Sequence, residues 1–305
     1  FDTQIIIQLQ RANMRILELP IPTYYGDEIC HVNGLKYAWN VIITTLRARL
    51  NDLGLVYDRI YDCRPAVTEL VYEAKLDFDS PHSRAVDNVV KGERVVEFGS
   101  GEGDLAHALT EKGCRVTGID RKEPGKQNKK AFKKFILQDL NLPMPKNLLA
   151  GADKLLMLDV IEHLALPERF VDGLREDPSL SANTVLLVST GNIGFFIVRF
   201  GLLAGMFNYG KRGILDLTHT RLYTFTTIRR LFEQSGFQVL EMSGVPAPLP
   251  LALGRGRLTR LLLMLNRIAI HIWPSLFAYQ IFLKAQKRPT LHDLLDNAQK
   301  QPHNP

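Results

Sequence analysis

A short β-strand pattern that runs into a glycine-rich turn constrains this chain more than any other feature. The run reads Val95-Val96-Glu97-Phe98-Gly99-Ser100-Gly101-Glu102-Gly103-Asp104-Leu105. A β-rich segment ends at Phe98, glycines follow at every second position, and a helical pattern begins at Asp104. Glycines let a ligand approach the backbone more closely than a Cβ allows, and the start of a helix offers unpaired N–H groups. The run therefore predicts a nucleotide-like ligand at the carboxyl end of a strand.

The spacing of these glycines distinguishes two classes of ligand. A dinucleotide-binding loop has the pattern GxGxxG, which would place its third glycine at the position of Asp104. The observed pattern Glu-x-Gly-x-Gly-x-Gly therefore weighs against a nicotinamide-dependent oxidoreductase. Asp120 ends the next expected strand, where a carboxylate can accept hydrogen bonds from both ribose hydroxyls. Both classes use such a residue, so Asp120 alone does not separate them.

Beyond this run, short β-rich segments alternate with helical segments. Such alternation is typical of a parallel sheet with helices on both faces. A hydrophobic content of 46% is enough to form its core. The expected fold class is α/β, with a doubly wound sheet. The β-rich segments are 95–98, 115–119, 135–137, 155–158, 185–189, 237–242 and 277–284, and the helical ones are 104–112, 167–175 and 227–235.

Three later motifs point to one family in combination. Gln138-Asp139-Leu140 follows the third strand, Leu156-Met157-Leu158-Asp159-Val160-Ile161-Glu162-His163-Leu164 spans the end of the fourth, and 237–242 with 277–284 form a closing strand pair. Together with the glycine loop, they resemble class I S-adenosylmethionine-dependent methyltransferases. The fourth-strand motif resembles that of the ubiquinone-biosynthesis O-methyltransferase group. The resemblance covers about 81–287 and implies a Rossmann-like, seven-stranded, mostly parallel sheet with an antiparallel last strand.

The resemblance also implies S-adenosyl-L-methionine as the cofactor, and the residues that bind it. Asp120 would accept from the ribose, Asp139 would accept from the adenine amino group, and Leu140 would pack on the adenine ring. Asp120 could instead cap a helix, and Asp139 could serve the turn alone. The expected cofactor-binding residues are Glu97, Gly99, Ser100, Gly101, Gly103, Asp120, Arg121, Asp139, Leu140, Asp159 and Val160.

The turn after the fourth strand holds candidate catalytic groups. Methyl transfer depends mainly on in-line placement of the reactants, but a hydroxyl acceptor would benefit from a base such as His163. On a helical turn, Asp159, Glu162 and His163 would share a face, and they could also hold Mg²⁺. No residue is assigned firmly as a metal ligand. The alternative is that Glu162 and His163 only shape the edge of the cofactor site and the start of a helix.

A long insertion at 191–225 separates the fifth strand from the next helix. Its end, Asp216-Leu217-Thr218-His219-Thr220-Arg221-Leu222-Tyr223-Thr224, resembles sequences at this place in the same broad group of methyltransferases. Loops at the carboxyl ends of strands cover the active site in this architecture. His219 is therefore a candidate catalytic residue, and Arg221 and Tyr223 are candidates for substrate binding. Alternatively, Thr224 or Thr226 caps the next helix, and His219 pairs with Arg221.

Positive charge is in excess, with a formal net charge of +6 and a pI near 9.2. Arg257, Arg260, Arg267 and His271 would share one side of a helix whose other side carries leucines and an isoleucine. Such a helix could lie on an anionic membrane, pack against the sheet or bind a second subunit. The lysines at 126–134 would share a helical face, either solvated or near a phosphate-bearing acceptor. We expect no nucleic-acid partner.

Neither a membrane span nor a cysteine framework is expected. No stretch reaches about 18 uninterrupted apolar residues, because arginines interrupt both candidates. Cys30, Cys63 and Cys114 form no CxxC pair. We therefore expect a cytoplasmic protein, with peripheral contact at the cytoplasmic membrane face at most. The sequence leaves the oligomeric state open.

The first 50 residues carry a second resemblance. Phe1-Asp2-Thr3-Gln4-Ile5-Ile6 and Glu18-Leu19-Pro20-Ile21-Pro22-Thr23-Tyr24-Tyr25-Gly26-Asp27-Glu28 resemble the carboxyl-terminal end of a family 2 glycosyltransferase of the polyprenyl-phosphate type. This implies methyl transfer to an oxygen of a glycan, a lipid-linked sugar or another hydrophobic small molecule. The alternative is a non-catalytic methyltransferase-fold module that supports a fused glycosyltransferase. The expected domains are 1–75, the methyltransferase domain at 76–288 and a loose tail at 289–305.

Overall fold

The computed structural model describes residues 2–20, 22, 32–52, 57–63, 76–250, 254 and 256–289. The chain divides into two compact units, one of Phe1–Leu70 with Met206–Leu217 and the other of Val71–Gly205 with Thr218–Pro305. The insertion after the fifth strand therefore contributes residues to both units. The segment 64–75 around the expected first boundary, most of the motif at 18–28 and the expected tail beyond 289 lie outside the described residues.

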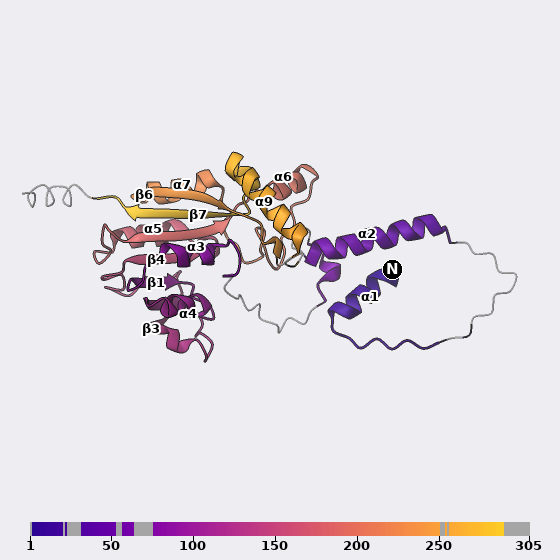
Figure 1. The fold of residues 1–305 in the computed structure, drawn as a ribbon, viewed down its shortest axis with the longest axis horizontal. Coiled ribbons are helices and arrows are strands. Elements are labelled where there is room, and N and C mark those ends of the chain that lie inside the picture. Colours follow the sequence, from indigo (N-terminus) through magenta and orange to yellow (C-terminus); the bar gives the residue numbers. More distant parts are fainter. Residues whose placement is uncertain are drawn as a thin grey trace, which may run out of the picture. The chain divides into compact units, whose positions relative to one another are not determined.

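The first unit holds two helices and a single 3₁₀ turn among its described residues. They are α1 (Asp2–Arg11), α2 (Gly34–Asp52) and η1 (Arg59–Tyr61), and both helices are drawn in indigo to purple in Figure 1. The sequence of this part predicts helices at about 2–13 and 35–50, and both are confirmed. It also predicts a strand at 15–19, which is wrong, because these residues form no regular element. A strand needs a partner for its N–H and C=O groups, which β-rich composition alone does not supply.

Arg11 connects the elements of the first unit. Its guanidinium donates to the carbonyls of Tyr61, at 3.0 Å, and of Ala48, at 2.6 Å. It also forms an ion pair with Asp52 at 2.7 Å. One side chain at the end of α1 therefore fastens both α2 and η1.

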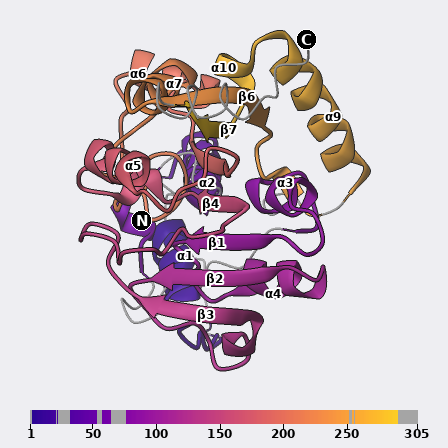
Figure 2. The ribbon, with the colours of Figure 1, turned by 90° about the vertical axis from the view of Figure 1, so that its left-hand side faces the viewer.

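The second unit is built on one sheet of seven strands. They are β1 (Arg94–Phe98), β2 (Arg115–Asp120), β3 (Phe132–Leu137), β4 (Lys154–Leu158), β5 (Val185–Gly191), β6 (Phe237–Val245) and β7 (Gln280–Lys287). Their order is β3-β2-β1-β4-β5-β7-β6, and the part from β3 through β2 and β1 to β4 can be followed upward in Figure 2. Strands β1 to β5 pair in parallel, whereas β7 is antiparallel to both β5 and β6. This confirms the predicted mostly parallel, doubly wound sheet with an antiparallel last strand.

Helices cover both faces of this sheet. Alternate residues of β4 point to opposite faces: Leu155 and Met157 belong to one buried cluster, and Leu156 and Leu158 to the other. The first cluster includes residues of α5 (Pro167–Glu176) and α7 (Phe225–Gln234). The second includes residues of α3 (Pro81–Asn88) and α4 (Asp104–Glu111). Other helical elements that the structure describes in this unit are η2 (Lys129–Ala131), η3 (Ile161–His163), α6 (Phe196–Leu203), α9 (Arg257–Ile272) and α10 (Pro274–Phe277).

The lysine-rich segment differs from expectation. Lys129 and Lys130 lie in the single turn η2, and Lys133 and Lys134 already belong to β3. The predicted helical face is therefore wrong. β3 is an edge strand, where exposed lysines are well tolerated because they discourage pairing with another chain. Among the helices that the structure describes, none is long and apolar enough to cross a membrane.

Candidate active site

The glycine turn lies at the carboxyl end of β1, and each of its three glycines has a positive φ. A Cβ on Gly99 would lie 2.5 Å from Cγ2 of Val160, and one on Gly103 would lie 2.8 Å from the ring of Phe132. Gly101 has a φ of 51°, and a Cβ there would meet nothing within 4 Å. Two of the glycines are thus required by packing inside the protein, and the middle one faces open space.

Asp120 fastens this turn to the end of β2. Its carboxylate accepts hydrogen bonds from the backbone N–H of Gly101, at 2.9 Å, and of Lys122, at 3.0 Å. No helix begins at Asp120, so the alternative of a helix cap does not hold. Arg121 is exposed directly after it. Asp120 therefore positions the open glycine at the end of β2, and its contact with a ribose stays a prediction.

Two buried polar groups beneath the turn lack protein partners. Glu97 is 5% exposed and Ser100 is 6% exposed. Within the part of the chain that the structure describes, neither Oε2 of Glu97 nor Oγ of Ser100 has a hydrogen-bond partner. Burial, with smaller contributions from the negative charges of Asp120 and Asp104, raises the pKa of Glu97 to about 8. A bound group that is cationic and rich in donors would satisfy these atoms, so the residues present fit the expected cofactor.

In the turn after β3, the side chain of Asp139 forms hydrogen bonds within the turn. Oδ1 of Asp139 accepts from both the backbone N–H and the side-chain amide of Asn141, each at 2.9 Å. Oδ1 of Asn141 in turn accepts from the backbone N–H of Ala165 at 2.8 Å. Leu140 is half-buried and packs against the core cluster. Asp139 therefore serves turn chemistry, as the alternative predicted, and its contact with an adenine stays a prediction.

Asp159, at the end of β4, is held by two strands. It has a φ of 54°, and Oδ1 accepts from the Ser189 hydroxyl of β5 at 2.7 Å. The Gln280 amide of β7 donates to both of its carboxylate oxygens, at 2.8 and 2.7 Å. Ser189 and Gln280 were not predicted from the sequence. Gln280 could not have been, because only the pairing of β5 with β7 brings it to Asp159.

The expected shared helical face of Asp159, Glu162 and His163 is wrong. Asp159 is in the left-handed region, and the helical turn η3 begins only at Ile161. Its carboxylate is turned toward Ser189 and Gln280. No group of three or more histidine, cysteine or acidic side chains among the described residues is placed to hold a metal ion. The structure therefore gives no support to the Mg²⁺ expectation.

Glu162 joins η3 to the end of the insertion. Its side chain is 2% exposed, and Oε1 lies 3.4 Å from the N–H of Gly191, which donates to it. Burial, with the nearby charge of Asp159, raises its pKa to about 8. Its backbone carbonyl accepts from the N–H groups of Thr220, at 2.8 Å, and of Arg221, at 3.2 Å. These bonds hold the insertion's last segment on the turn after β4.

The two candidate catalytic histidines are brought together by this attachment. The rings of His163 and His219 meet edge to face, with centroids 4.7 Å apart. Nδ1 of His163 also lies 3.1 Å from the hydroxyl oxygen of Thr218 and 3.3 Å from its carbonyl oxygen. Residues 56 positions apart in the sequence thus form one polar cluster. His163 follows Val160 by three residues, and it is Val160 whose side chain packs at Gly99 of the glycine turn.

The two candidate substrate residues point in different directions. Nε of Arg221 lies 4.0 Å from Oε1 of Glu168 on α5, and both side chains are about half exposed. Tyr223 is 6% exposed, and its hydroxyl has no hydrogen-bond partner. Burial raises the pKa of Tyr223, and the charges of Glu168 and Glu162 add to the rise. Arg221 is therefore accessible to a ligand, whereas Tyr223 belongs to the core beside Glu162.

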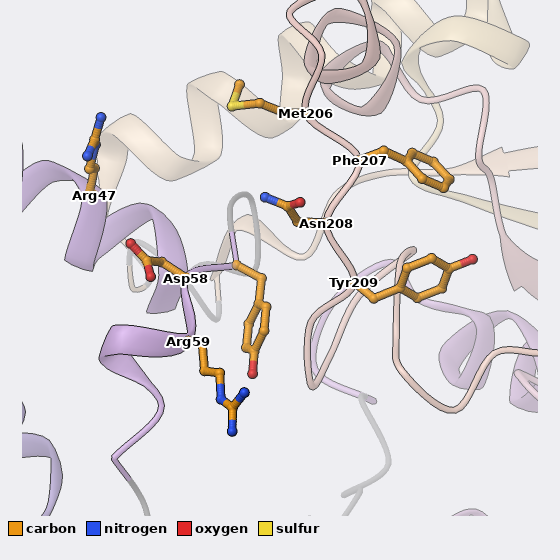
Figure 3. A pocket seen from close by; sticks show the side chains of 8 residues that line it. Arg47, Asp58, Arg59, Met206, Phe207, Asn208 and Tyr209 are labelled. Carbon is orange, nitrogen blue, oxygen red and sulfur yellow. The ribbon is translucent and has the colours of Figure 1, made fainter.

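A separate cavity of about 500 Å³ lies within the first unit. Figure 3 shows Arg47 of α2 and the aromatic residues of the segment at 206–209 around it. None of the predicted site residues lines this cavity. Its lining residues are Arg47, Tyr57, Asp58, Arg59, Met206, Phe207, Asn208 and Tyr209.

Comparison with known families identifies the class of protein. Residues 70–242, more than half of the chain, match the family described as "Methyltransferase domain". The chain therefore belongs to this methyltransferase family. Membership implies S-adenosylmethionine as the methyl donor, in agreement with the open glycine turn and the unsatisfied groups beneath it. None of the curated proteins compared with the chain matches it.

Several solved structures are similar to this chain at low identity. One is a chain of the complex between the Haloferax volcanii Trm112 methyltransferase activator and a putative methyltransferase, 17% identical over 70% of this chain and 92% of that one, with a TM-score of 0.45. A possible histamine N-methyltransferase from Thermotoga maritima is 17% identical over 68% and 88%, with a TM-score of 0.44. The Burkholderia thailandensis 1,6-didemethyltoxoflavin-N1-methyltransferase is 12% identical over 88% and 99%, with a TM-score of 0.45. At these levels of likeness, none of them assigns an acceptor.

Proposed function

We propose that this methyltransferase acts on an oxygen of a glycan, a lipid-linked sugar or another hydrophobic small molecule. The observation that carries the proposal is the pairing of His163 with His219 on the turn after β4, the turn whose Val160 packs at Gly99. An imidazole is suited to accept a proton from a hydroxyl acceptor at neutral pH. The pair lies at the edge of the sheet where the parallel strands end, which is where ligands bind in open α/β sheets.

The hydrogen bonds of His163 suggest how it would act. The cofactor supplies a methyl group activated by its sulfonium. A proton on Nδ1 of His163 that is donated to the Thr218 carbonyl leaves the lone pair of the ring on Nε2. As the new C–O bond forms and the S–C bond breaks, the acceptor's hydroxyl proton moves to Nε2. Glu162 acts as a positioning residue, because its carbonyl holds the segment that carries His219.

The surface of the insertion supports a hydrophobic acceptor. In α6, which lies in the same insertion as His219, Phe200, Leu202 and Leu203 are 65%, 59% and 83% exposed. Exposed apolar side chains of this size, close together in one element, often mark a binding surface. The resemblance of the first 50 residues to a polyprenyl-phosphate glycosyltransferase supports a sugar-bearing or lipid-linked acceptor in particular.

The proposal can be tested by methyl transfer from labelled cofactor into a fractionated cell-envelope extract. We expect label in a lipid or glycan fraction, with mass spectrometry placing the methyl group on oxygen. His163→Ala and His219→Ala should each slow the transfer by roughly a hundredfold with unchanged affinity for S-adenosylhomocysteine. His107→Ala, which changes an exposed histidine on α4, is the matched control and should transfer normally.

Three results would contradict the proposal. Label on a nitrogen or carbon atom would exclude an oxygen acceptor. Transfer by His163→Ala and His219→Ala at the rate of the unaltered protein would exclude these histidines as catalytic groups. Intact cofactor binding with no transfer into any fraction would favour the alternative of a non-catalytic module.

A further inference from the structure

Helix α9 is firmly attached to the second unit by its inner side. Oδ1 of Asn266 accepts from the N–H of Ala247 at 3.2 Å, and its amide donates to the carbonyl of Phe277 at 3.0 Å. Ile270 is 9% exposed and packs so closely on β6 that a Cβ on Gly244 would lie 2.7 Å from its Cγ2. These contacts fix the rotation of α9 about its own axis. Its outer side therefore stays turned away from the sheet.

This outer side carries a row of large apolar side chains, which we call the apolar stripe. Their spacing of three and four residues places them on one face of the helix. Each is at least half exposed, from 50% for Leu261 and Leu265 to 77% for Ile272. Trp273, which follows directly, is 52% exposed. The apolar stripe consists of Leu258, Leu261, Leu265, Ile268 and Ile272.

A row of basic residues runs beside the apolar stripe. Arg257, Arg260, Arg267 and His271 are exposed, and α9 contains no acidic residue. Nε of Arg267 lies 3.5 Å from Oδ2 of Asp79, a pair whose arginine is 58% exposed. The outer side of α9 therefore combines hydrophobic and cationic character along its whole length.

From this arrangement we infer that α9 docks in the plane of an anionic membrane surface. At such a surface the apolar stripe would be buried at the boundary of headgroups and acyl chains. The flanking arginines would bind anionic headgroups, so both the apolar and the basic part of the outer side would have a partner. A second copy of the chain would satisfy only the apolar half. Two such helices packed antiparallel along their stripes would bring their arginine rows together, with no acidic residue on either helix. The positive charge of α9 thus favours binding to an anionic lipid surface over packing against a second copy of the helix.

The first test measures binding of the full chain to vesicles. Vesicles of phosphatidylcholine mixed with phosphatidylglycerol should sediment the protein, and pure phosphatidylcholine vesicles should do so much less. Added salt should weaken the binding, because it screens the arginines. Leu261→Asn with Leu265→Asn, and separately Arg257→Gln with Arg260→Gln, should each reduce vesicle binding on the order of tenfold.

Matched controls come from the same unit. Val90→Asn with Leu240→Asn changes two exposed apolar residues elsewhere, and Arg229→Gln with Arg230→Gln changes two exposed arginines on α7. Both control variants should bind like the unaltered protein. Equal losses in the control and α9 variants, or no vesicle binding at all, would overturn the inference.

A second readout reports on α9 itself and does not depend on enzyme activity. The chain has two tryptophans, Trp39 and Trp273, so Trp39→Phe leaves Trp273 as the single reporter. Its fluorescence should shift to shorter wavelength when anionic vesicles are added. An unchanged emission would contradict the inference. So would a dimer in analytical ultracentrifugation that Leu261→Asn with Leu265→Asn dissolves, because the apolar stripe would then be covered by a second copy.

Discussion

At the scale of single residues, we expect Glu97 to couple cofactor binding to pH. Its pKa is raised to about 8, so the side chain is protonated in the empty protein below that pH. A cation bound beside it favours the ionised form, which must first lose its proton. Affinity for S-adenosylmethionine should therefore increase as the pH rises toward about 8, by up to about tenfold per pH unit, and then level off. Isothermal titration calorimetry over this range measures the slope.

Glu97→Gln is the control for this prediction. The amide does not titrate, so the variant should bind more weakly than the unaltered protein above pH 8 and should show a flatter dependence on pH. A pH dependence that is the same in both proteins would show that another group is responsible.

Glu162 should make the protein less stable at high pH. Burial raises its pKa from 4.5 to about 8, so the folded protein keeps a proton that the unfolded chain releases. The free energy of unfolding contributed by this group is therefore fully present below pH 4.5 and is lost as the pH rises toward about 8. Glu162→Gln removes this loss and should be more stable than the unaltered protein above pH 8, by about 1–3 kcal/mol.

Thermal unfolding at two pH values checks this difference. The two proteins should unfold at similar temperatures in acid and should separate in alkali, with the variant higher. A variant that is less stable than the unaltered protein at both pH values would mean that the carboxyl group makes a contact that an amide cannot replace.

At the scale of elements, Thr220 attaches the insertion to the catalytic turn. Its hydroxyl donates to the carbonyls of Glu162 and Leu164, and its N–H donates to Glu162 as well. Thr220→Val removes the hydroxyl bonds but keeps the shape of the side chain. We expect His219 to lose its fixed place beside His163, which should lower kcat roughly tenfold to a hundredfold with little change in cofactor affinity.

The transfer assay with labelled cofactor measures this effect. Thr226→Val, an exposed threonine on α7, is the matched control and should leave kcat unchanged. A rate for Thr220→Val equal to that of the control would show that this attachment does not position the histidine.

Elements whose signals are local could be predicted from the sequence. Ser80 before Pro81 is the sequence pattern of an N-cap and a first helical position, and the structure shows a capping box between Ser80 and Ser83. Thr224 likewise caps α7 with Thr227, as one of the alternatives held. The glycine turn was equally predictable, because all three glycines have a positive φ and two of them, Gly99 and Gly103, have no room for a Cβ.

Elements that depend on distant partners were not predictable. The run at 15–19 has β-rich composition but pairs with nothing in the described part of the chain. The lysine-rich segment looked helical, yet residues from Phe132 onward pair with β2 as an edge strand. Asp159 was expected on a helical turn, but Gln280, more than a hundred residues later, holds its carboxylate on the sheet. No local pattern encodes these contacts.

At the scale of the whole molecule, the insertion after β5 contributes residues to both units. Met206–Leu217 belongs with the amino-terminal residues, whereas the following segment from Thr218 carries His219 to the catalytic turn. The sequence predicted an active-site role for the insertion as a single piece. The division of the insertion between the two units could not be predicted, because it depends on contacts between residues far apart in the chain.

The central claim is that the glycine turn holds S-adenosylmethionine, and titration of two arginine variants with S-adenosylhomocysteine tests it most directly. Gly101 and Gly92 both have a positive φ and open space around the site of a Cβ, so Gly101→Arg and Gly92→Arg strain the backbone alike. Only Gly101 lies beside Asp120 in the turn after β1. We predict that Gly101→Arg abolishes binding while Gly92→Arg binds like the unaltered protein. Retained binding in a folded Gly101→Arg variant would contradict the account.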